Sequence, residues 1–243
     1  MYNFDEPVNK RGTLSGKWRE IKDGGYIPDG AIPMHVAEMD YKIAPELADR
    51  ITKRVEWMNF GYDHLPDGFE DAIVWHYQDK FGVKLEKEWI VKIPSIMSGM
   101  NMACKMIGGT LFYNSPMYSH IRVLTDETKQ PVIEVPMGLD GNRYFMDLNK
   151  MEEMITPDVK SFILCNPHNP VGRVYSKEEL EEVVAFCKKH DLILISDEIH
   201  CEIVYDGQHL PCFGINEDSL NQSMTFNSAG KILNIPGLLN VID

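Results

Sequence analysis

Short apolar runs alternate with stretches of helical periodicity through the second half of the chain. Five runs are predicted to form strands: TLFYN from residue 110, PVIEVPM from 131, SFILCNP from 161, LILISDE from 192 and SMTFNS from 223. Runs such as LILIS are apolar at successive positions, so both faces of such a strand must be covered. The alternation predicts an α/β fold in which a mainly parallel sheet lies between two helical layers.

Helical periodicity is clearest in three other segments. Apolar side chains recur every three or four residues over 45–58 and over 69–81, which predicts two amphipathic helices. A third helix is predicted to begin after Ser176, because Ser176 and Glu179 have the spacing of a capping box. The N-terminal segment has too many glycines and prolines for long regular elements. We therefore expect an N-terminal arm with part of a small domain over residues 1–45, and a large domain over residues 46–243.

The composition favours a globular protein that binds a small molecule. Of the 243 residues, 44% are hydrophobic, which is enough for a substantial core. The formal charge of -13 repels nucleic acid and anionic lipid, and no apolar run approaches the ~20 residues that span a bilayer. The five cysteines include no CxxC spacing, so we expect reduced thiols and a cytoplasmic protein.

Polar residues directly follow the last three predicted strands. Asn166 and Asn169 follow SFILC, Asp197 follows LILIS, and Ser228 and Lys231 follow SMTFN. The carboxyl ends of parallel strands meet at one edge of a sheet, where open α/β sheets bind their ligands. An amine for a Schiff base, a carboxylate for a ring nitrogen and an amide for a phenolic oxygen match the requirements of a pyridine aldehyde cofactor.

Each of these residues also has an ordinary structural explanation. Aspartate after a strand is often a helix N-cap, asparagine in NPHNP is often a turn former, and a lysine is usually solvated. Their common order along the predicted sheet favours the cofactor site. The segment from Asp197 to His209 is rich in His, Cys, Asp and Glu, but it lacks HExxH or paired-histidine spacing, so we expect no metal site.

Three segments of the chain carry a resemblance to a known superfamily. NPHNPVGRVYSKEEL, SDEIHCEIVY and NSAGKILNIPGL resemble the active-site segments of pyridoxal phosphate (PLP) dependent transferases of fold type I. Within it, the chain is most similar to the MalY/PatB branch of cystathionine β-lyases, also called cysteine-S-conjugate β-lyases. SDEIH, FDEPVNKRGTLSGKW, IPMHVAEMDYKIAPEL and FGYD carry this second resemblance. It covers Phe4 to about Leu238 and implies the three-layer large domain of the aminotransferase fold, with pyridoxal 5'-phosphate as the cofactor.

The resemblance implies roles for the residues around the cofactor ring. Lys231 would hold the cofactor covalently and remove the α proton of the substrate. Asp197 would pair with the pyridinium nitrogen, Asn169 and His200 would contact the phenolic oxygen, and Tyr118 would stack on the ring.

The resemblance also implies how the phosphate is bound. Ser228 would bind it together with the backbone N–H groups of Ile96 and Met97, at a predicted helix start whose dipole favours an anion. Tyr62 would reach the phosphate of a partner subunit, so a homodimer is expected.

The sequence departs from the family pattern in two respects. Six residues differ from the family's usual ones near the predicted site: His35, Glu38, Ser119, His120, Ile232 and Leu233. The chain also contains no arginine after Arg173 for the substrate carboxylate. We therefore expect that the C-terminal small domain is largely missing.

The resemblance implies a β-lyase that acts on cystathionine or cysteine S-conjugates and releases thiol, pyruvate and ammonia. Two alternatives remain open at this point. The same residues serve a class I/II aminotransferase, and a truncated chain could be a non-catalytic protein that binds PLP for regulation. A small amino-acid substrate is expected, and neither nucleic acid nor a membrane is expected as a partner.

Overall fold

The computed structural model describes residues 2–19, 27, 30–62 and 64–238. The chain divides into two compact units, one formed by residues 65–228 and the other by residues 1–64 together with 229–243. The sequence predicts a different division, into an arm over 1–45 and a large domain over 46–243. That division stays a prediction.

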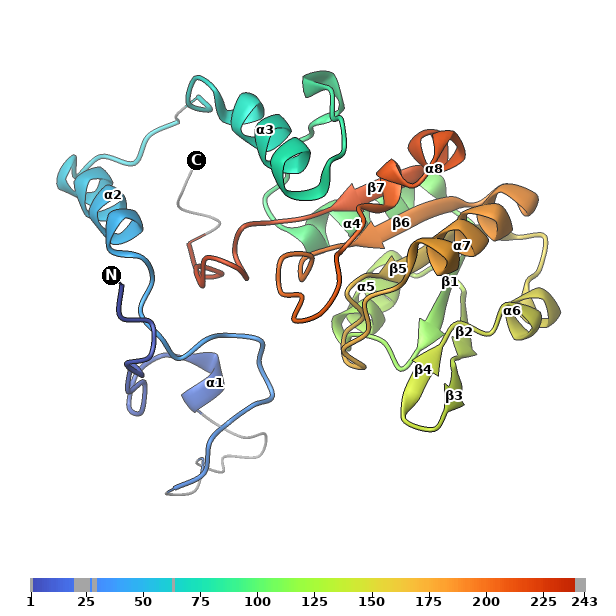
Figure 1. The fold of residues 1–243 in the computed structure, drawn as a ribbon, viewed down its shortest axis with the longest axis horizontal. Helices are drawn as coiled ribbons and strands as arrows, with labels where there is room; N and C mark the ends of the chain where they lie inside the picture. The colour runs from blue at the N-terminus through green and yellow to red at the C-terminus, as the bar shows by residue number, and fades with distance from the viewer. Residues whose placement is uncertain (1, 20–26, 28–29, 63, 239–243) are drawn as a thin grey trace. The chain divides into compact units, whose positions relative to one another are not determined.

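The larger unit is built on a parallel sheet of five strands in the order β2-β1-β5-β6-β7 (Figure 1). These strands are β1 (Thr110–Ser115), β2 (Val132–Pro136), β5 (Val159–Cys165), β6 (Ile193–Asp197) and β7 (Ser223–Phe226). Each coincides with one of the predicted apolar runs. The predicted α/β class with a parallel sheet is therefore confirmed.

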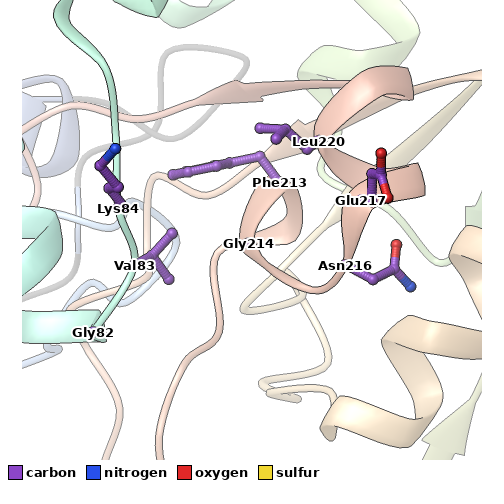
Figure 2. Close-up of a pocket in the computed structure, with 8 residues that line it drawn as sticks. All are labelled: Gly82, Val83, Lys84, Phe213, Gly214, Asn216, Glu217 and Leu220. Carbon is purple, nitrogen blue, oxygen red and sulfur yellow. The ribbon is translucent and has the colours of Figure 1, made fainter.

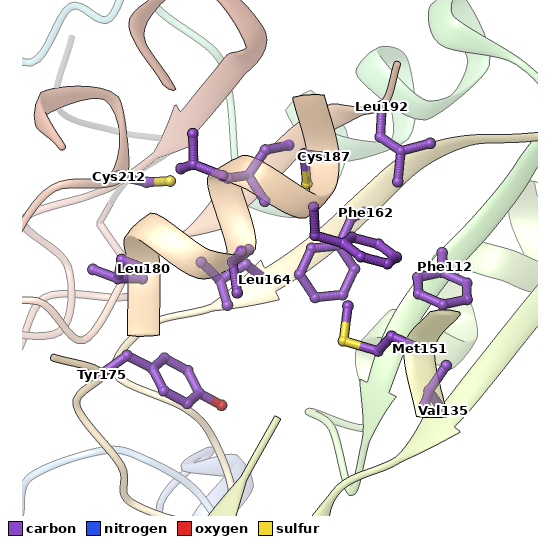
Figure 3. Close-up of a cluster of buried hydrophobic side chains, with 14 of the residues drawn as sticks. Phe112, Val135, Met151, Phe162, Leu164, Tyr175, Leu180, Cys187, Leu192 and Cys212 are labelled. Carbon is purple, nitrogen blue, oxygen red and sulfur yellow. The ribbon is translucent and has the colours of Figure 1, made fainter. Parts of the chain in front are cut away.

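One face of the sheet is covered by α6 (Leu148–Met154) and α7 (Lys177–Lys189). Because side chains alternate along a strand, every second residue points to this side. The buried residues here include Phe112, Phe162, Leu164 and Leu194 from the strands and Met151, Leu180, Val183 and Cys187 from the helices (Figure 3). The rings of Phe112 and Phe186 stack at 6.1 Å, which joins the end of α7 to β1.

The opposite face is covered by α4 (Ile96–Ile107) and α5 (His120–Thr128). In Figure 1, α7 lies in front of the sheet, and α4 and α5 lie behind it. The buried residues on this side are Leu111, Tyr113, Ile163 and Ile195 from the strands and Met100, Ala103, Cys104, Ile121 and Leu124 from the helices. The predicted three-layer arrangement is thus confirmed.

The N-terminus of α7 is formed by the predicted capping box. The Ser176 hydroxyl accepts the Glu179 N–H at 3.3 Å, and the Glu179 carboxylate accepts the Ser176 N–H at 2.8 Å. Glu179 also receives two bonds from the guanidinium of Arg173, at 2.8 and 2.9 Å. The cap therefore fixes both the start of α7 and the segment that connects it to β5.

The remaining elements of the larger unit are short, apart from α3 (Phe69–Phe81), whose range was predicted. They are η1 (Lys87–Trp89), β3 (Gly138–Asp140), β4 (Arg143–Phe145), η2 (Cys212–Gly214) and α8 (Glu217–Gln222). Strands β3 and β4 pair as an antiparallel hairpin. Tyr77 and Phe81 of α3 pack with Cys201, and this cluster attaches α3 to the loop after β6.

The smaller unit contains α1 (Gly16–Arg19) and α2 (Pro45–Glu56), and α2 confirms the helix predicted over 45–58. Asp40 connects its segments, because its carboxylate pairs with Lys17 at 2.7 Å and accepts the indole N–H of Trp18 at 2.8 Å. The side chain of Asn234 accepts the Met39 N–H and donates to the Met39 carbonyl, both at 3.1 Å. These contacts join the segment after residue 228 to the N-terminal part of the unit.

We expect Ser176→Ala to lower the free energy of unfolding by about 1 kcal/mol, because the side-chain cap of α7 is lost. Ser119→Ala is the matched control, since Ser119 occupies the N-cap position of α5 without a side-chain cap hydrogen bond. Urea denaturation followed by circular dichroism measures both. Equal stability of the two variants would contradict the role of the cap.

Candidate active site

Three strands end side by side at the edge where ligands bind in open α/β sheets. Cys165 of β5 is in register with Asp197 of β6, and Asp197 is in register with Phe226 of β7. The pairing continues beyond the strands, because the Asn166 N–H donates to the Asp197 carbonyl at 3.0 Å and the Glu198 N–H donates to the Phe226 carbonyl at 2.8 Å. The backbone on both sides of Asp197 is therefore fixed.

Asp197 is buried, with 4% of its surface exposed, and it points to the α4 side of the sheet. Its direction follows from Ile195, two residues earlier, which packs in the cluster on that side. Tyr118 packs against the same cluster. Burial, followed by the negative charge of Asp197, raises the pKa of Tyr118. The structure therefore brings two predicted site residues close together at one edge.

The turn after β5 contains a buried histidine, His168, that no sequence pattern indicated. The His168 ring bonds through Nε2 to the Pro116 carbonyl at 2.8 Å and through Nδ1 to the Tyr175 hydroxyl at 2.8 Å. The next residue is Asn169, a half-buried predicted ligand whose N–H contacts the Cys165 sulfur at 3.5 Å. The turn that carries Asn169 is thus bonded to the segment that leads to Tyr118.

The predicted phosphate-binding amides lie at the first turn of α4. The Ser95 side chain caps this helix by accepting the N–H three residues later, and Ile96 and Met97 are the first two helical residues. The first N–H groups of a helix have no intrahelical acceptor, and the helix dipole favours an anion beside them. A Cβ atom added at Gly99 would lie 2.9 Å from a ring carbon of Phe226, so glycine lets this turn approach the end of β7.

Glu198 forms a buried polar network on the α7 side of the sheet. It is fully buried, and one carboxylate oxygen accepts the Ser196 hydroxyl at 2.9 Å and the Cys212 N–H at 2.8 Å. The other oxygen bonds to Nε2 of buried His209 at 2.9 Å. In the sequence, Glu198 and His209 belong to the segment rich in His, Cys, Asp and Glu, whose composition suggested only a metal site. An acidic residue directly after a buried strand was the available signal for this network.

The other two predicted residues of the larger unit lie on loops that leave the same edge. His200 is half-buried in a turn in which its carbonyl accepts the Ile203 N–H at 2.8 Å. The Ser228 N–H bonds to the Asn227 side chain at 2.7 Å, and the Asn227 amide donates to the Tyr77 hydroxyl at 3.2 Å. The loop before Ser228 is therefore attached to α3.

Lys231 and Tyr62 belong to the smaller unit. The Lys231 amine donates to the Ala37 carbonyl at 2.8 Å, and Tyr62 is fully exposed. Asp63, the last residue of FGYD, lies outside the described residues. The roles of Lys231 and Tyr62 at the cofactor site stay predictions from the sequence.

Two of the residues that depart from the family pattern, His120 and Glu38, make clear contacts. The His120 ring stacks on Tyr118 with 4.8 Å between ring centroids and 20° between planes, so His120 supplies an aromatic neighbour of Tyr118. Glu38 pairs with Lys10 at 2.5 Å and accepts the Ser15 hydroxyl at 3.3 Å. His120 and Glu38 therefore each contact residues close to them within their own unit.

A shallow pocket of about 320 Å³ lies between the segment after α3 and the η2–α8 segment (Figure 2). Val83 approaches the backbone of Gly214 so closely that a Cβ atom there would lie 2.8 Å from both Val83 methyl groups. None of the predicted site residues lines this pocket. The pocket is therefore separate from the strand-end edge.

Neither a metal-binding cluster nor a membrane-spanning helix is found in the described part of the chain. Within residues 2–19, 27, 30–62 and 64–238, no group of three or more His, Cys, Asp or Glu side chains could hold a metal ion. Across these same residues, no helix has both the length and the apolar character needed to cross a membrane. All five cysteines are buried and free of disulfide bonds.

Residues 34–238 match the family described as aminotransferase class I and II, and the chain belongs to this family. Cystathionine beta-lyase PatB of Bacillus subtilis (strain 168) is 30% identical over 241 residues, which cover 97% of this chain and 62% of that protein. The predicted resemblance to this branch is confirmed.

Solved structures show the same likeness. A PLP-bound putative aminotransferase from Clostridium difficile 630 has a TM-score of 0.90 and 33% identity, with 98% of this chain and 62% of that chain covered. A PLP-bound C-S lyase from Staphylococcus hominis has a TM-score of 0.85 and 26% identity over the same shares. The chain thus spans 62% of the length of these proteins.

We expect Glu198→Leu to lower the free energy of unfolding by about 3–5 kcal/mol, because three buried donors lose their acceptor. Glu202→Leu is the control, since Glu202 makes a partly exposed pair with His76, at 2.9 Å, whose loss costs at most about 1 kcal/mol. Urea denaturation of both variants measures the difference. A loss for Glu198→Leu no larger than for Glu202→Leu would contradict the structural role of the network.

Proposed function

We propose that the chain is part of a PLP-dependent carbon-sulfur β-lyase that acts on cystathionine or cysteine S-conjugates. The observation that best supports this is a buried carboxylate, Asp197, on the same face and edge of a parallel sheet as Tyr118, beside the turn that carries Asn169. The similarity to cystathionine β-lyases and C-S lyases indicates which reaction such an edge serves.

The residues at this edge fit the cofactor chemically. A buried carboxylate is favourable when it faces a cation, and the protonated pyridine nitrogen of PLP is one. Tyr118 offers an aromatic face, and Asn169 offers an amide donor. The first turn of α4 offers N–H groups and a dipole suited to a phosphate. The buried Nδ2 of Asn166 has no partner among the described residues, so this edge also contains a further amide donor.

PLP supplies an aldehyde for the substrate amine and a ring that withdraws electrons from the substrate α carbon. In our proposal, Asp197 keeps the proton on the ring nitrogen, while Asn169 and His200 donate to the phenolic oxygen. Tyr118 orients the ring by stacking. The Lys231 amine holds the cofactor at rest and removes the α proton as general base.

The proposal extends to the phosphate and to the assembly. Ser228 and the N–H groups of Ile96 and Met97 bind the phosphate, and Tyr62 reaches the phosphate of a partner subunit in a homodimer. The full exposure of Tyr62 is consistent with a contact outside its own chain. We place the protein in the cytoplasm, where five buried free thiols are stable.

We expect Lys231→Ala to remove the visible absorbance of the lysine-bound cofactor. We also expect turnover to fall by at least about 10²- to 10⁴-fold, which is the contribution of a positioned general base. Lys177→Ala is the control, since Lys177 is an exposed lysine that pairs with Glu181. Spectra after addition of PLP, and pyruvate release from cystathionine, measure the two effects. Unchanged absorbance in Lys231→Ala would contradict the assignment.

The product distinguishes the lyase from an aminotransferase, the activity named in the family description and for the Clostridium difficile structure. Release of thiol together with pyruvate supports the lyase. Exchange of an amino group with a keto acid, without thiol release, supports the aminotransferase. Cofactor binding without turnover of any amino acid would indicate a protein that only binds PLP.

A further inference from the structure

His168 links two segments of the edge that carry predicted contacts to the cofactor ring. Its Nε2 lies 2.8 Å from the Pro116 carbonyl oxygen, and Tyr118 follows Pro116 by two residues. Its Nδ1 lies 2.8 Å from the Tyr175 hydroxyl. A carbonyl oxygen can only accept, so Nε2 carries the proton and Nδ1 accepts the tyrosine O–H. The two contacts together require one tautomer of the neutral ring.

The surroundings of His168 favour this neutral form. The ring is buried, with 2% exposed, and Tyr175 beside it is 1% exposed. Burial lowers the pKa of His168, and the nearby positive charge of Arg173 lowers it further, although the bond to the Pro116 carbonyl opposes both effects. The Arg173 guanidinium is held by Glu179 at 2.8 Å. At neutral pH the His168 ring therefore stays neutral, with Nε2 as the donor and Nδ1 as the acceptor.

We propose that His168 is a positioning residue that fixes the segment of Tyr118 relative to the turn of Asn169, and so sets the space that receives the cofactor ring. That this space receives a PLP ring rests on the proposed function. Stacking on Tyr118 and a hydrogen bond from Asn169 constrain the same ring in two directions, so a shift between the two segments weakens both contacts. His168 acts through these residues and does not itself touch the ring.

Four variants separate this role from simple stability. His168→Phe keeps an aromatic ring but removes both hydrogen bonds, and His168→Gln restores an amide donor for the Pro116 carbonyl. Tyr175→Phe removes only the bond to Nδ1. Phe186→Leu is the control, because it weakens the core in contact with Phe112 and leaves the His168 bonds in place.

The first measurement uses the protein without cofactor. Nuclear magnetic resonance of the histidine ring nitrogens should show His168 as the neutral Nε2–H tautomer. A titration of the Tyr118 phenol should give a pKa above the ordinary 10.0 in the unmodified chain and in Phe186→Leu. In His168→Phe the pKa of Tyr118 should return toward 10.0, because the displaced phenol becomes less buried and moves away from Asp197. An Nδ1–H tautomer, or a Tyr118 pKa in His168→Phe that is raised as far as in the unmodified chain, would overturn the proposal.

The second measurement is the equilibrium affinity for PLP. His168→Phe should bind about tenfold more weakly, the loss expected for one misplaced aromatic contact. His168→Gln should recover most of the affinity, Tyr175→Phe should fall between the two, and Phe186→Leu should match the unmodified chain. An equal loss in Phe186→Leu would show that His168 acts only through stability. If the unmodified chain binds no PLP, the proposed function fails, while the tautomer and the Tyr118 titration still decide whether His168 positions Tyr118.

Discussion

The candidate site depends on the register of β5, β6 and β7. Because Cys165, Asp197 and Phe226 are aligned across three parallel strands, the loops that follow them leave the sheet from one edge. Side-chain alternation then sends Asp197 to the side of α4 and Ser196 to the side of α7. A slip of one residue would exchange the two sides and place the aspartate among the apolar residues under α7. The burial of both faces therefore selects the register that places Asp197 at the site.

The edge is held by buried polar contacts as well as by apolar packing. Glu198 bonds to His209 and to the Cys212 backbone on one side of the sheet, and His168 bonds to Pro116 and Tyr175 beyond the end of β5. Unpaired polar groups are costly in such surroundings, so each contact restricts where its loop can lie. The loops that carry the predicted cofactor contacts are thus attached to the rigid sheet at several points.

The sequence predicts the strands and the site residues for one physical reason. A strand buried on both faces must be apolar at successive positions, which makes its limits visible, and the polar residue that ends it is then visible as well. Asp197 and Asn169 were found in this way. The helices α6 and α8 are too short for a clear periodic pattern. The bonds of His168 were not predictable, because Pro116 lies 52 residues away in the sequence and nothing local indicates the pairing.

The protonation states of the side chains at this edge also determine which ligands it can bind. Burial and neighbouring charges raise the pKa values of Tyr118 and Cys165 and lower that of His168, so all three are neutral at neutral pH. Asp197 supplies negative charge that acts on both Tyr118 and Cys165, and Glu198 adds to its effect on Cys165. An edge with a buried carboxylate among neutral polar groups and an aromatic face suits a flat ring that carries one positive charge.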